Sequence, residues 1–361
     1  MRAAVMRNKK ITVDDIPIPA PGPGEVLVKT LSCGICGSDL HTLKHAEKLV
    51  EVSRRSGGPF IMDLSRDIVM GHEFCAEVVE FGPDTQRRIK PGTRVCAMPV
   101  LLKPSRVETV GYSNDNPGGY GEFMRLTERL LLEVPNGLST ERAALTEPMA
   151  VGYHAAQKAR LSDDDVPLVI GCGPVGLSVI AALKLMNAGP IIAADFSPAR
   201  RRLAQTIGAD VIVDPAQQSP YESWKQMAAY NDPLKAPSRP PWLTGPSLRP
   251  AVIFECVGVP GMIDALMASA PANARLVVVG VCMEPDQIEP MIGTNKELSI
   301  QFVLGYSSDE FRNTLQHLAE GRINGDPLIT GRVGVEGVAK AFETLASPAL
   351  HAKILVEPWH N

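Results

Sequence analysis

Short apolar runs, some alternating with polar residues, occupy most of the first 140 positions of the chain. Residues 74–82 (FCAEVVEFG), 92–100 (GTRVCAMPV) and 118–126 (GGYGEFMRL) each predict a strand. The N-terminal stretch MRAAVMRNKKITV also indicates a strand, and a turn rich in Pro and Gly follows at 19–24. We expect this region to form a mostly antiparallel β domain.

From about residue 141 the pattern changes to alternating helices and strands. ERAALTEPMAVGYHAAQKA has helical spacing, with Pro148 at a point where a helix must start or be interrupted. Apolar strand-like runs such as VPLVI, AVIFECVG and ARLVVVGV are then separated by helical stretches. This alternation predicts an α/β fold with a doubly wound parallel sheet of the Rossmann type. The segment 231–250, which carries six prolines, is expected to be a surface insertion.

Composition and charge exclude several classes of protein. The net charge of −4 gives no sign of nucleic-acid or membrane binding, and no apolar run reaches 18 residues. The seven Cys are scattered over 361 residues, which does not resemble a disulfide framework. We therefore expect a reduced, cytoplasmic protein with no nucleic-acid or membrane partner.

A glycine-rich turn follows the apolar strand at 168–170. GCGPVG supplies Gly171, Gly173 and Gly176, with Pro174 and Val175 between the last two glycines. A strand before it and a helix after it are the context in which this pattern binds a dinucleotide pyrophosphate at a helix N-terminus. A tightly packed helix turn that binds no ligand is the alternative.

The residue that follows the next strand points to the choice of cofactor. Asp195 lies 19 residues after Gly176, the usual place for an acid that binds the ribose hydroxyls. A 2′-phosphate would be repelled there, so NAD is expected over NADP. Arg200 and Arg201 leave the other choice open, because guanidinium groups bind phosphate.

A second candidate site begins at CGICGSDLH, residues 33–41. A redox dithiol needs the strand-to-helix turn of a βαβ unit, whereas this segment lies in a β-rich region. A structural zinc site usually needs a second close Cys pair, and the chain has none. A catalytic zinc site needs three protein ligands, and Cys36, His72 and Glu147 supply the right chemical types.

Four motifs carry a resemblance to a known family. CGICGSDLH, GHEF, EPMAVGYHA and GCGPVG, in this order, resemble the zinc-dependent medium-chain alcohol dehydrogenases, and the Glu-Pro form of the third resembles the polyol, butanediol and threonine dehydrogenase branch. The resemblance implies a GroES-like catalytic domain at 1–147, a Rossmann domain at 148–305 and a return to the catalytic domain at 306–361. It also implies an active site in the cleft between the two domains.

The resemblance further implies roles for single residues. Cys36, His72 and Glu147 would hold the catalytic zinc, and Glu73 would sit behind it and exchange for Glu147. Asp39 would orient His72, while Ser38 and His41 would pass the substrate proton out. His41 could instead merely pack or bond locally. The residues expected to bind the cofactor are Gly171, Gly173, Pro174, Val175, Gly176, Asp195, Arg200, Val257, Gly280, Leu304 and Lys353.

The chain departs from the family in one lobe. Family members commonly bind a second, structural zinc through four closely spaced Cys near residues 95–115, where this chain has Cys96 alone. We expect one catalytic zinc and no structural zinc. Apolar residues must then hold the lobe: Val100, Leu101, Leu102 and Val107. The segment 43–70 is either a solvated loop and helix or a lobe that closes over the substrate.

The expected function is hydride transfer between NAD and a secondary alcohol, diol or polyol, or the matching ketone. The alternatives are a zinc-free, NADPH-dependent reductase of the same superfamily and a non-catalytic nucleotide-binding protein on this scaffold. The strand ELSIQFVLGY at 297–306 alternates apolar and mostly polar residues, and we expect it to pair a homodimer or homotetramer.

Overall fold

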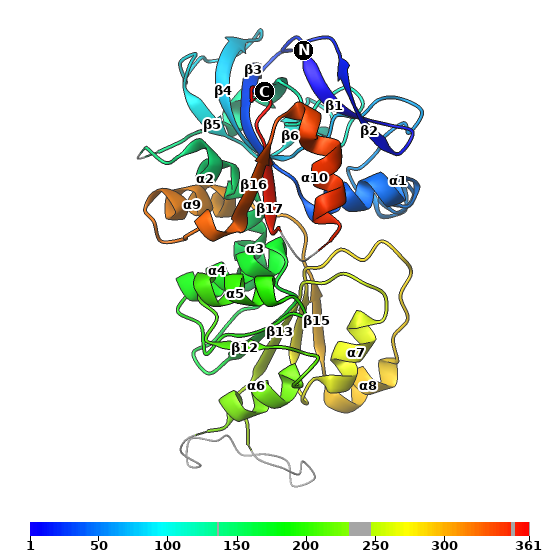
Figure 1. The fold of residues 1–361 in the computed structure, drawn as a ribbon, viewed down its shortest axis with the longest axis vertical. Coiled ribbons are helices and arrows are strands. Elements are labelled where there is room, and N and C mark those ends of the chain that lie inside the picture. Colours follow the sequence, from blue (N-terminus) through cyan, green and yellow to red (C-terminus); the bar gives the residue numbers. More distant parts are fainter. Residues whose placement is uncertain (136, 231–246, 348–350, 361) are drawn as a thin grey trace. The chain divides into compact units, whose positions relative to one another are not determined.

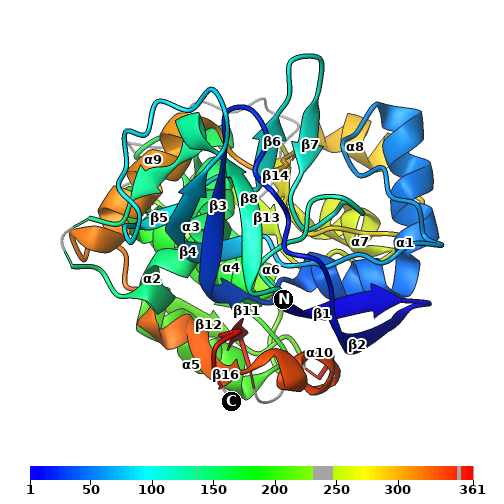
Figure 2. The same cartoon turned by 90° about the horizontal axis from the view of Figure 1, so that it is seen from above.

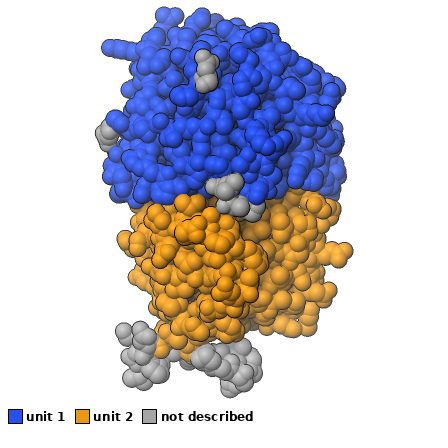
Figure 3. Space-filling model, viewed as in Figure 1, with its two compact units in different colours: residues 1–148, 307–361 blue, residues 149–306 orange. Residues whose placement is uncertain are grey.

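The computed structural model describes residues 1–135, 137–230, 247–347 and 351–360. It forms two compact units, which Figure 3 distinguishes by colour. Unit 1 combines Met1–Pro148 with Ser307–Asn361, and unit 2 is Met149–Tyr306. The expected α/β fold class is confirmed, with a β-rich unit and a unit built on a parallel sheet.

Unit 1 contains a seven-stranded sheet. The order is β16-β17-β3-β4-β5-β9, and β8 pairs with β3 outside this path. Every pairing is antiparallel except that of β16 with β17, so the expected antiparallel domain is confirmed. The strands are β3 (Glu25–Gly34), β4 (Glu73–Phe81), β5 (Arg94–Cys96), β8 (Phe123–Thr127), β9 (Leu132–Glu133), β16 (Ile329–Val333) and β17 (Lys353–Val356).

The N-terminal stretch expected as one strand is a hairpin. It turns at Asn8 and Lys9, both in the left-handed region with φ of 49° and 57°, between β1 (Arg2–Arg7) and β2 (Lys10–Asp15). Figure 2 shows α10 beside this hairpin. The helices of unit 1 are α1 (Gly37–Ser56), α2 (Thr140–Ala144), α9 (Ser308–Ala319) and α10 (Val338–Leu345), with single 3₁₀ turns η1 (Glu128–Leu130), η3 (Asp326–Leu328) and η4 (Val335–Gly337).

The lobe without its four Cys is a second hairpin, β6 (Val100–Leu102) with β7 (Val107–Thr109). Leu101 is fully buried, as expected of a residue that holds the lobe. Val107 is 53% exposed, so the expectation that it helps to hold the lobe is wrong. Val100 and Leu102 are half-buried, so β6 holds the lobe through Leu101 and its two neighbours.

Unit 2 contains a six-stranded parallel sheet (Figure 1). Its order is β12-β11-β10-β13-β14-β15, and every pairing is parallel. The order reverses between β10 and β13, which is where such sheets bind nucleotides beyond the carboxyl ends of the strands. The strands are β10 (Val166–Ile170), β11 (Ile192–Ala194), β12 (Val211–Val213), β13 (Ala251–Glu255), β14 (Arg275–Val278) and β15 (Ser299–Phe302).

Helices cover this sheet. Trp224 of α6, with Leu266 and Met267 of α7, shares one apolar core with the central strands, while α4 and α5 pack together above the strands in Figure 1. The helices are α3 (Thr146–Lys158, shared with unit 1), α4 (Pro174–Leu185), α5 (Pro198–Ile207), α6 (Pro220–Ala228), α7 (Met262–Ser269) and α8 (Pro290–Lys296). Most of the expected insertion at 231–250 lies outside the described residues.

No helix in the described part of the chain is both long and apolar enough to cross a bilayer.

Candidate active site

The CGIC segment forms a strand-to-helix turn. Strand β3 ends at Gly34, Cys36 caps the N-terminus of α1, and α1 begins at Gly37. The β-rich region expected from sequence is present, but the turn into a helix was not anticipated. Cys33 is nevertheless fully buried within an antiparallel sheet, which differs from the βαβ setting of a redox dithiol.

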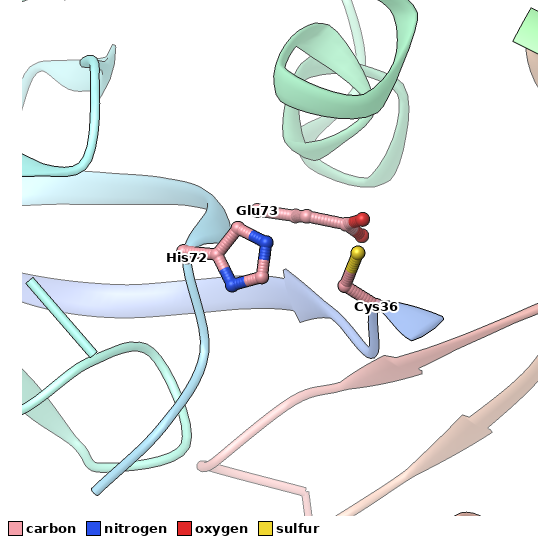
Figure 4. Close-up of side chains that lie close together, drawn as sticks. All are labelled: Cys36, His72 and Glu73. Carbon is pink, nitrogen blue, oxygen red and sulfur yellow. The ribbon is translucent and has the colours of Figure 1, made fainter. Parts of the chain in front are cut away.

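A thiol, an imidazole and a carboxylate converge at this turn. The ligand atoms of Cys36, His72 and Glu73 lie within 4.8 Å of one another, and Figure 4 shows the three side chains close together. Strand pairing causes this, because Glu73 at the start of β4 lies opposite Gly34 at the end of β3. His72 is 8% exposed and Glu73 is fully buried, while Cys36 is half-buried. Sulfur, nitrogen and oxygen donors of this kind fit a zinc ion.

The carboxylate of Glu73 forms a buried ion pair with Lys353. Both of its carboxylate oxygens lie 2.6 Å from Nζ of Lys353, which also donates to the Ile35 carbonyl at 3.1 Å. Burial alone would lower the pKa of Lys353, but the negative charges of Glu73 and Cys36 outweigh it and raise that pKa. Lys353, expected to bind the cofactor, is fully buried in unit 1 as the partner of Glu73.

Glu147, the other carboxylate expected at the metal, lies in the first turn of α3 and is 9% exposed. Among the described residues, the compact ligand group contains Glu73 and does not include Glu147. Glu147 is near enough to Lys353 for its charge to raise the pKa of that lysine. Two carboxylates therefore share the surroundings of one buried ammonium.

Asp39 lies behind His72 at the centre of a buried hydrogen-bond network. Its Oδ1 is 3.4 Å from Nδ1 of His72 and accepts from the Tyr112 hydroxyl at 2.8 Å. Its Oδ2 accepts from the Tyr120 hydroxyl at 2.6 Å and from the Cys36 N–H at 3.0 Å. Burial would raise the pKa of Asp39, but the charge of His72 and these donors lower it. Asp39 in turn raises the pKa of His72 against the effect of burial.

Tyr112 and Tyr120 were not anticipated from sequence. They lie 73 and 81 residues from Asp39, and no local motif marks either of them. Both side chains are buried, at 6% and 0% exposure. Only the fold brings them next to Asp39.

The two residues of the expected proton path both lie in α1. Ser38 Oγ is 2.8 Å from the Tyr112 hydroxyl, and His41 follows one turn later on the helix. His41 is half-buried, and burial together with the charges of His45 and Lys44 lowers its pKa below the usual value. Its neutral, proton-accepting form therefore predominates at neutral pH.

The glycine-rich turn of unit 2 is shaped by close backbone approach. Gly171 has φ of +91°, and a Cβ on Gly176 would lie 1.9 Å from the Gly171 carbonyl oxygen. Gly173 caps α4, and Pro174 is the first helical residue. A Cβ on Gly173 would meet only the Arg200 guanidinium within 4 Å, at 3.7 Å. The N-terminus of α4 is thus accessible to an anion.

Asp195 follows β11 and is held by two backbone amides. Its Oδ2 accepts from the Cys172 N–H at 2.8 Å and its Oδ1 from the Ser197 N–H at 2.7 Å. Arg201 is committed to Asp214, at 2.9 Å, and to the carbonyls of Asp195 and Phe196. Asp195 therefore fixes the glycine-rich turn against the end of the neighbouring strand.

The remaining expected cofactor contacts also follow strand ends. Val257 comes two residues after β13, Gly280 two after β14 and Leu304 two after β15. A Cβ on Gly171 would lie 2.7 Å from Val257 Cγ2, so Val257 borders the glycine-rich turn. Apart from Lys353, the expected cofactor residues thus gather at or just beyond the carboxyl edge of the sheet.

Comparison with known proteins covers nearly the whole chain. A family model for zinc-binding dehydrogenases matches residues 174–320, and one for the alcohol dehydrogenase GroES-like domain matches 22–136. (R,R)-butanediol dehydrogenase of Bacillus subtilis (strain 168) is 32% identical over 99% of this chain and 100% of its own, and sorbitol dehydrogenase of Bos taurus is 30% identical over 96% and 93%. A structure described as a zinc-binding dehydrogenase from Sinorhizobium meliloti 1021 bound to NADP has a TM-score of 0.77 and 25% identity, with 99% of each chain covered.

Replacing Lys353 tests the buried ion pair. Lys353→Met leaves Glu73 charged and buried, so we expect the free energy of unfolding to fall by about 3–5 kcal/mol. Glu73→Gln combined with Lys353→Met should recover most of the loss. Urea unfolding of metal-stripped protein measures this.

The control is Lys340→Met, which breaks the exposed pair with Glu343 and should leave the unfolding midpoint unchanged. A double variant no more stable than Lys353→Met alone would contradict the ion-pair account.

Proposed function

The chain belongs to the zinc-dependent medium-chain alcohol dehydrogenase family, and from this premise we propose that it transfers a hydride between NAD and a secondary alcohol, diol or polyol, or the matching ketone. The observation that carries the proposal is the convergence of Cys36, His72 and a buried carboxylate in unit 1. The names of the butanediol and sorbitol dehydrogenases support a small polyhydroxylated substrate.

We assign Cys36, His72 and Glu147 as the zinc ligands. Glu73 is the weaker candidate for the resting site, because its charge is compensated by Lys353 through both oxygens. Glu73 would remain behind the site and be able to exchange for Glu147. The thiolate and one carboxylate together balance the 2+ charge of zinc.

In the proposed reaction, zinc and NAD activate the substrate and accept the hydride, and the protein side chains move the proton. Zinc supplies Lewis acidity that makes the substrate hydroxyl easier to ionise, and NAD supplies a hydride acceptor. Ser38 lies two residues from Cys36, and its Oγ would accept the proton of that hydroxyl while giving up its own hydroxyl hydrogen to His41. His41, neutral at physiological pH, takes the proton onward to solvent.

Asp195 supports NAD as the preferred cofactor, since an acid just after the second strand of such a sheet commonly binds the ribose hydroxyls and would repel a 2′-phosphate. Arg200 is the residue that opposes this preference, because its guanidinium lies 3.7 Å from where a Cβ on Gly173 would be. The NADP in the Sinorhizobium meliloti structure makes the choice a matter for direct measurement.

We also propose that two copies of the chain pair along β15. In the described part of the sheet β15 is an edge strand whose neighbour is β14. Phe302 is 64% exposed and Leu304 is 75% exposed at this edge. An unpaired apolar edge favours aggregation, and a second copy would cover it.

Turnover and metal content test the central proposal together. Protein purified without added metal should contain about one zinc per chain, because the chain offers one three-ligand set. It should reduce NAD with at least one secondary alcohol, diol or polyol. Cys36→Ala should remove both zinc and activity while NAD binding persists.

Two tightly held zinc ions per chain would contradict the single-site assignment. Turnover that survives complete removal of zinc would favour the zinc-free reductase, and an absence of turnover with every alcohol and ketone would favour the non-catalytic protein.

Asp195→Asn tests the cofactor preference. Asparagine keeps one oxygen acceptor for the backbone amides but removes the charge, so kcat/KM for NADP relative to NAD should rise about tenfold or more. Adding Arg200→Met should reverse much of this gain. Arg202→Met, which removes an equal charge from an exposed position on α5, is the matched control. A wild-type preference for NADP would contradict the role assigned to Asp195.

The proton path predicts a graded response. Ser38→Ala should lower kcat by about 100-fold with zinc retained, and His41→Gln should lower it less. Protonated His41 cannot accept a proton, so wild-type alcohol oxidation should fall as pH drops through a pKa below 6.5. His41→Gln should lose this acidic limb, whereas His45→Gln should move it to higher pH.

A His41→Gln enzyme with the wild-type rate and pH profile would show that the proton leaves by another route.

Light scattering measures the oligomeric state. We expect a mass two or four times the 38.8 kDa of the chain. Phe302→Glu with Leu304→Glu should shift the mass toward the monomer, because charges oppose apolar pairing. Gln301→Glu adds a charge at an exposed position of the same strand and should shift it less. A wild-type mass near 38.8 kDa would rule out this pairing.

A further inference from the structure

The Tyr112 hydroxyl bridges Ser38 and Asp39. Its oxygen lies 2.8 Å from Ser38 Oγ and 2.8 Å from Asp39 Oδ1. The ring is fixed by contacts with His72, at 5.2 Å between centroids, and with Phe60, at 5.3 Å. With its side chain buried and its ring held on two sides, the hydroxyl has little freedom to move.

The number of hydrogens fixes the direction of both bonds. A phenol has one hydrogen to donate, and an ionised carboxylate only accepts. Three donors bind the oxygens of Asp39, namely Tyr112, Tyr120 and the Cys36 N–H, and Nδ1 of His72 lies 3.4 Å from Oδ1. Tyr112 therefore donates its hydroxyl hydrogen to Asp39. The hydrogen bond between Tyr112 and Ser38 must then be donated by the Ser38 hydroxyl.

This direction determines what Ser38 offers to a ligand. With its own hydrogen directed at Tyr112, Oγ presents only lone pairs to any other partner. A ligand hydroxyl beside Ser38 must then donate its hydrogen to Oγ. An alcohol meets this requirement, whereas a ligand that only accepts hydrogen bonds leaves Oγ unsatisfied.

We propose that Tyr112 is a positioning residue that holds Ser38 as a hydrogen-bond acceptor, so that the site selects ligands that donate a hydroxyl hydrogen. The inference rests on the proposed function, because it takes Ser38 to face the reacting oxygen. It adds a residue that acts through Ser38 before the reaction: when Oγ accepts the substrate hydrogen, the hydrogen that Ser38 had donated to Tyr112 is released toward His41.

The chain provides a matched control in Tyr120. Its hydroxyl also donates to Asp39, at 2.6 Å, and otherwise contacts the Gly34 carbonyl at 3.5 Å. Tyr112→Phe and Tyr120→Phe each remove one donor from Asp39, but only Tyr112→Phe removes the acceptor of the Ser38 hydrogen. A change in ligand binding or rate that arises through Asp39 and His72 should appear in both variants. A change that arises through Ser38 should appear only in Tyr112→Phe.

Ligand binding, measured without turnover, distinguishes an effect through Ser38 from an effect through Asp39 and His72. The probes are trifluoroethanol, which donates a hydrogen and resists oxidation, and dimethyl sulfoxide, which only accepts. Calorimetry on zinc-loaded enzyme with saturating NAD gives both dissociation constants for wild type and the two variants. In Tyr112→Phe the Ser38 hydrogen is released, so binding should weaken for trifluoroethanol and tighten for dimethyl sulfoxide.

The ratio of the dissociation constant of dimethyl sulfoxide to that of trifluoroethanol should fall by about three- to tenfold in Tyr112→Phe, as expected for one hydrogen bond. Tyr120→Phe should keep the wild-type ratio within about twofold, whatever it does to kcat. Equal ratios in Tyr112→Phe and wild type, or equal changes in the two variants, would overturn the proposal. Tyr112→Met gives the same comparison where Tyr112→Phe folds poorly.

Kinetics in a Ser38→Ala background provide a second readout. Tyr112→Phe should lower kcat for alcohol oxidation by about tenfold with KM for NAD unchanged, and by less than about twofold when Ser38 is already Ala. An equal loss in both backgrounds would contradict action through Ser38. A wild-type enzyme that oxidises no alcohol would contradict the proposed function, whereas an active enzyme with unchanged ligand ratios would contradict the role of Tyr112.

Discussion

The buried carboxylate of Asp39 is the constraint on which the site depends. Taking an ionised carboxylate out of water is costly unless donors replace the lost hydration, and here they come from three separate parts of unit 1. The Cys36 N–H belongs to the turn before α1, the imidazole of His72 to the entry of β4, and the hydroxyls of Tyr112 and Tyr120 to the segment before β8. Satisfying one charge therefore fixes the thiol, the imidazole and Ser38 together.

The buried charge of Glu73 similarly holds separate segments of unit 1 together. Lys353 of β17 neutralises Glu73 and holds the Ile35 carbonyl, so the C-terminal strand closes onto the turn that carries Cys36. In unit 2, Asp195 similarly joins the glycine-rich turn to the end of β11 through two amides. Asp39, Glu73 and Asp195 each accept hydrogen bonds from backbone or side-chain donors, most of them distant in sequence. These bonds fix the positions of the neighbouring functional groups.

The sequence was informative where chemistry is local. Gly171, Gly173 and Gly176 with their flanking strand and helix lie within one short window, and the parallel sheet follows from periodicity alone. The start of the helix after Cys36 was not predicted, because Cys36 occupies its cap in place of a usual polar residue, although Leu40, Leu43 and Val50 have helical spacing. Tyr112, Tyr120 and the pairing of Lys353 with Glu73 could not be found this way, since their partners lie 73, 81 and 280 residues distant. Lys353 was expected to bind the cofactor only through the family resemblance, and its sequence position gives no sign of its buried partner Glu73.

The central claim is that Cys36, His72 and one carboxylate hold a single zinc ion in unit 1. X-ray absorption at the zinc edge of the purified protein measures the donor set directly. The account predicts one sulfur at about 2.3 Å and nitrogen and oxygen donors at about 2.0–2.2 Å, and no bound zinc in Cys36→Ala. A spectrum with two or more sulfur donors, or with none, would contradict it.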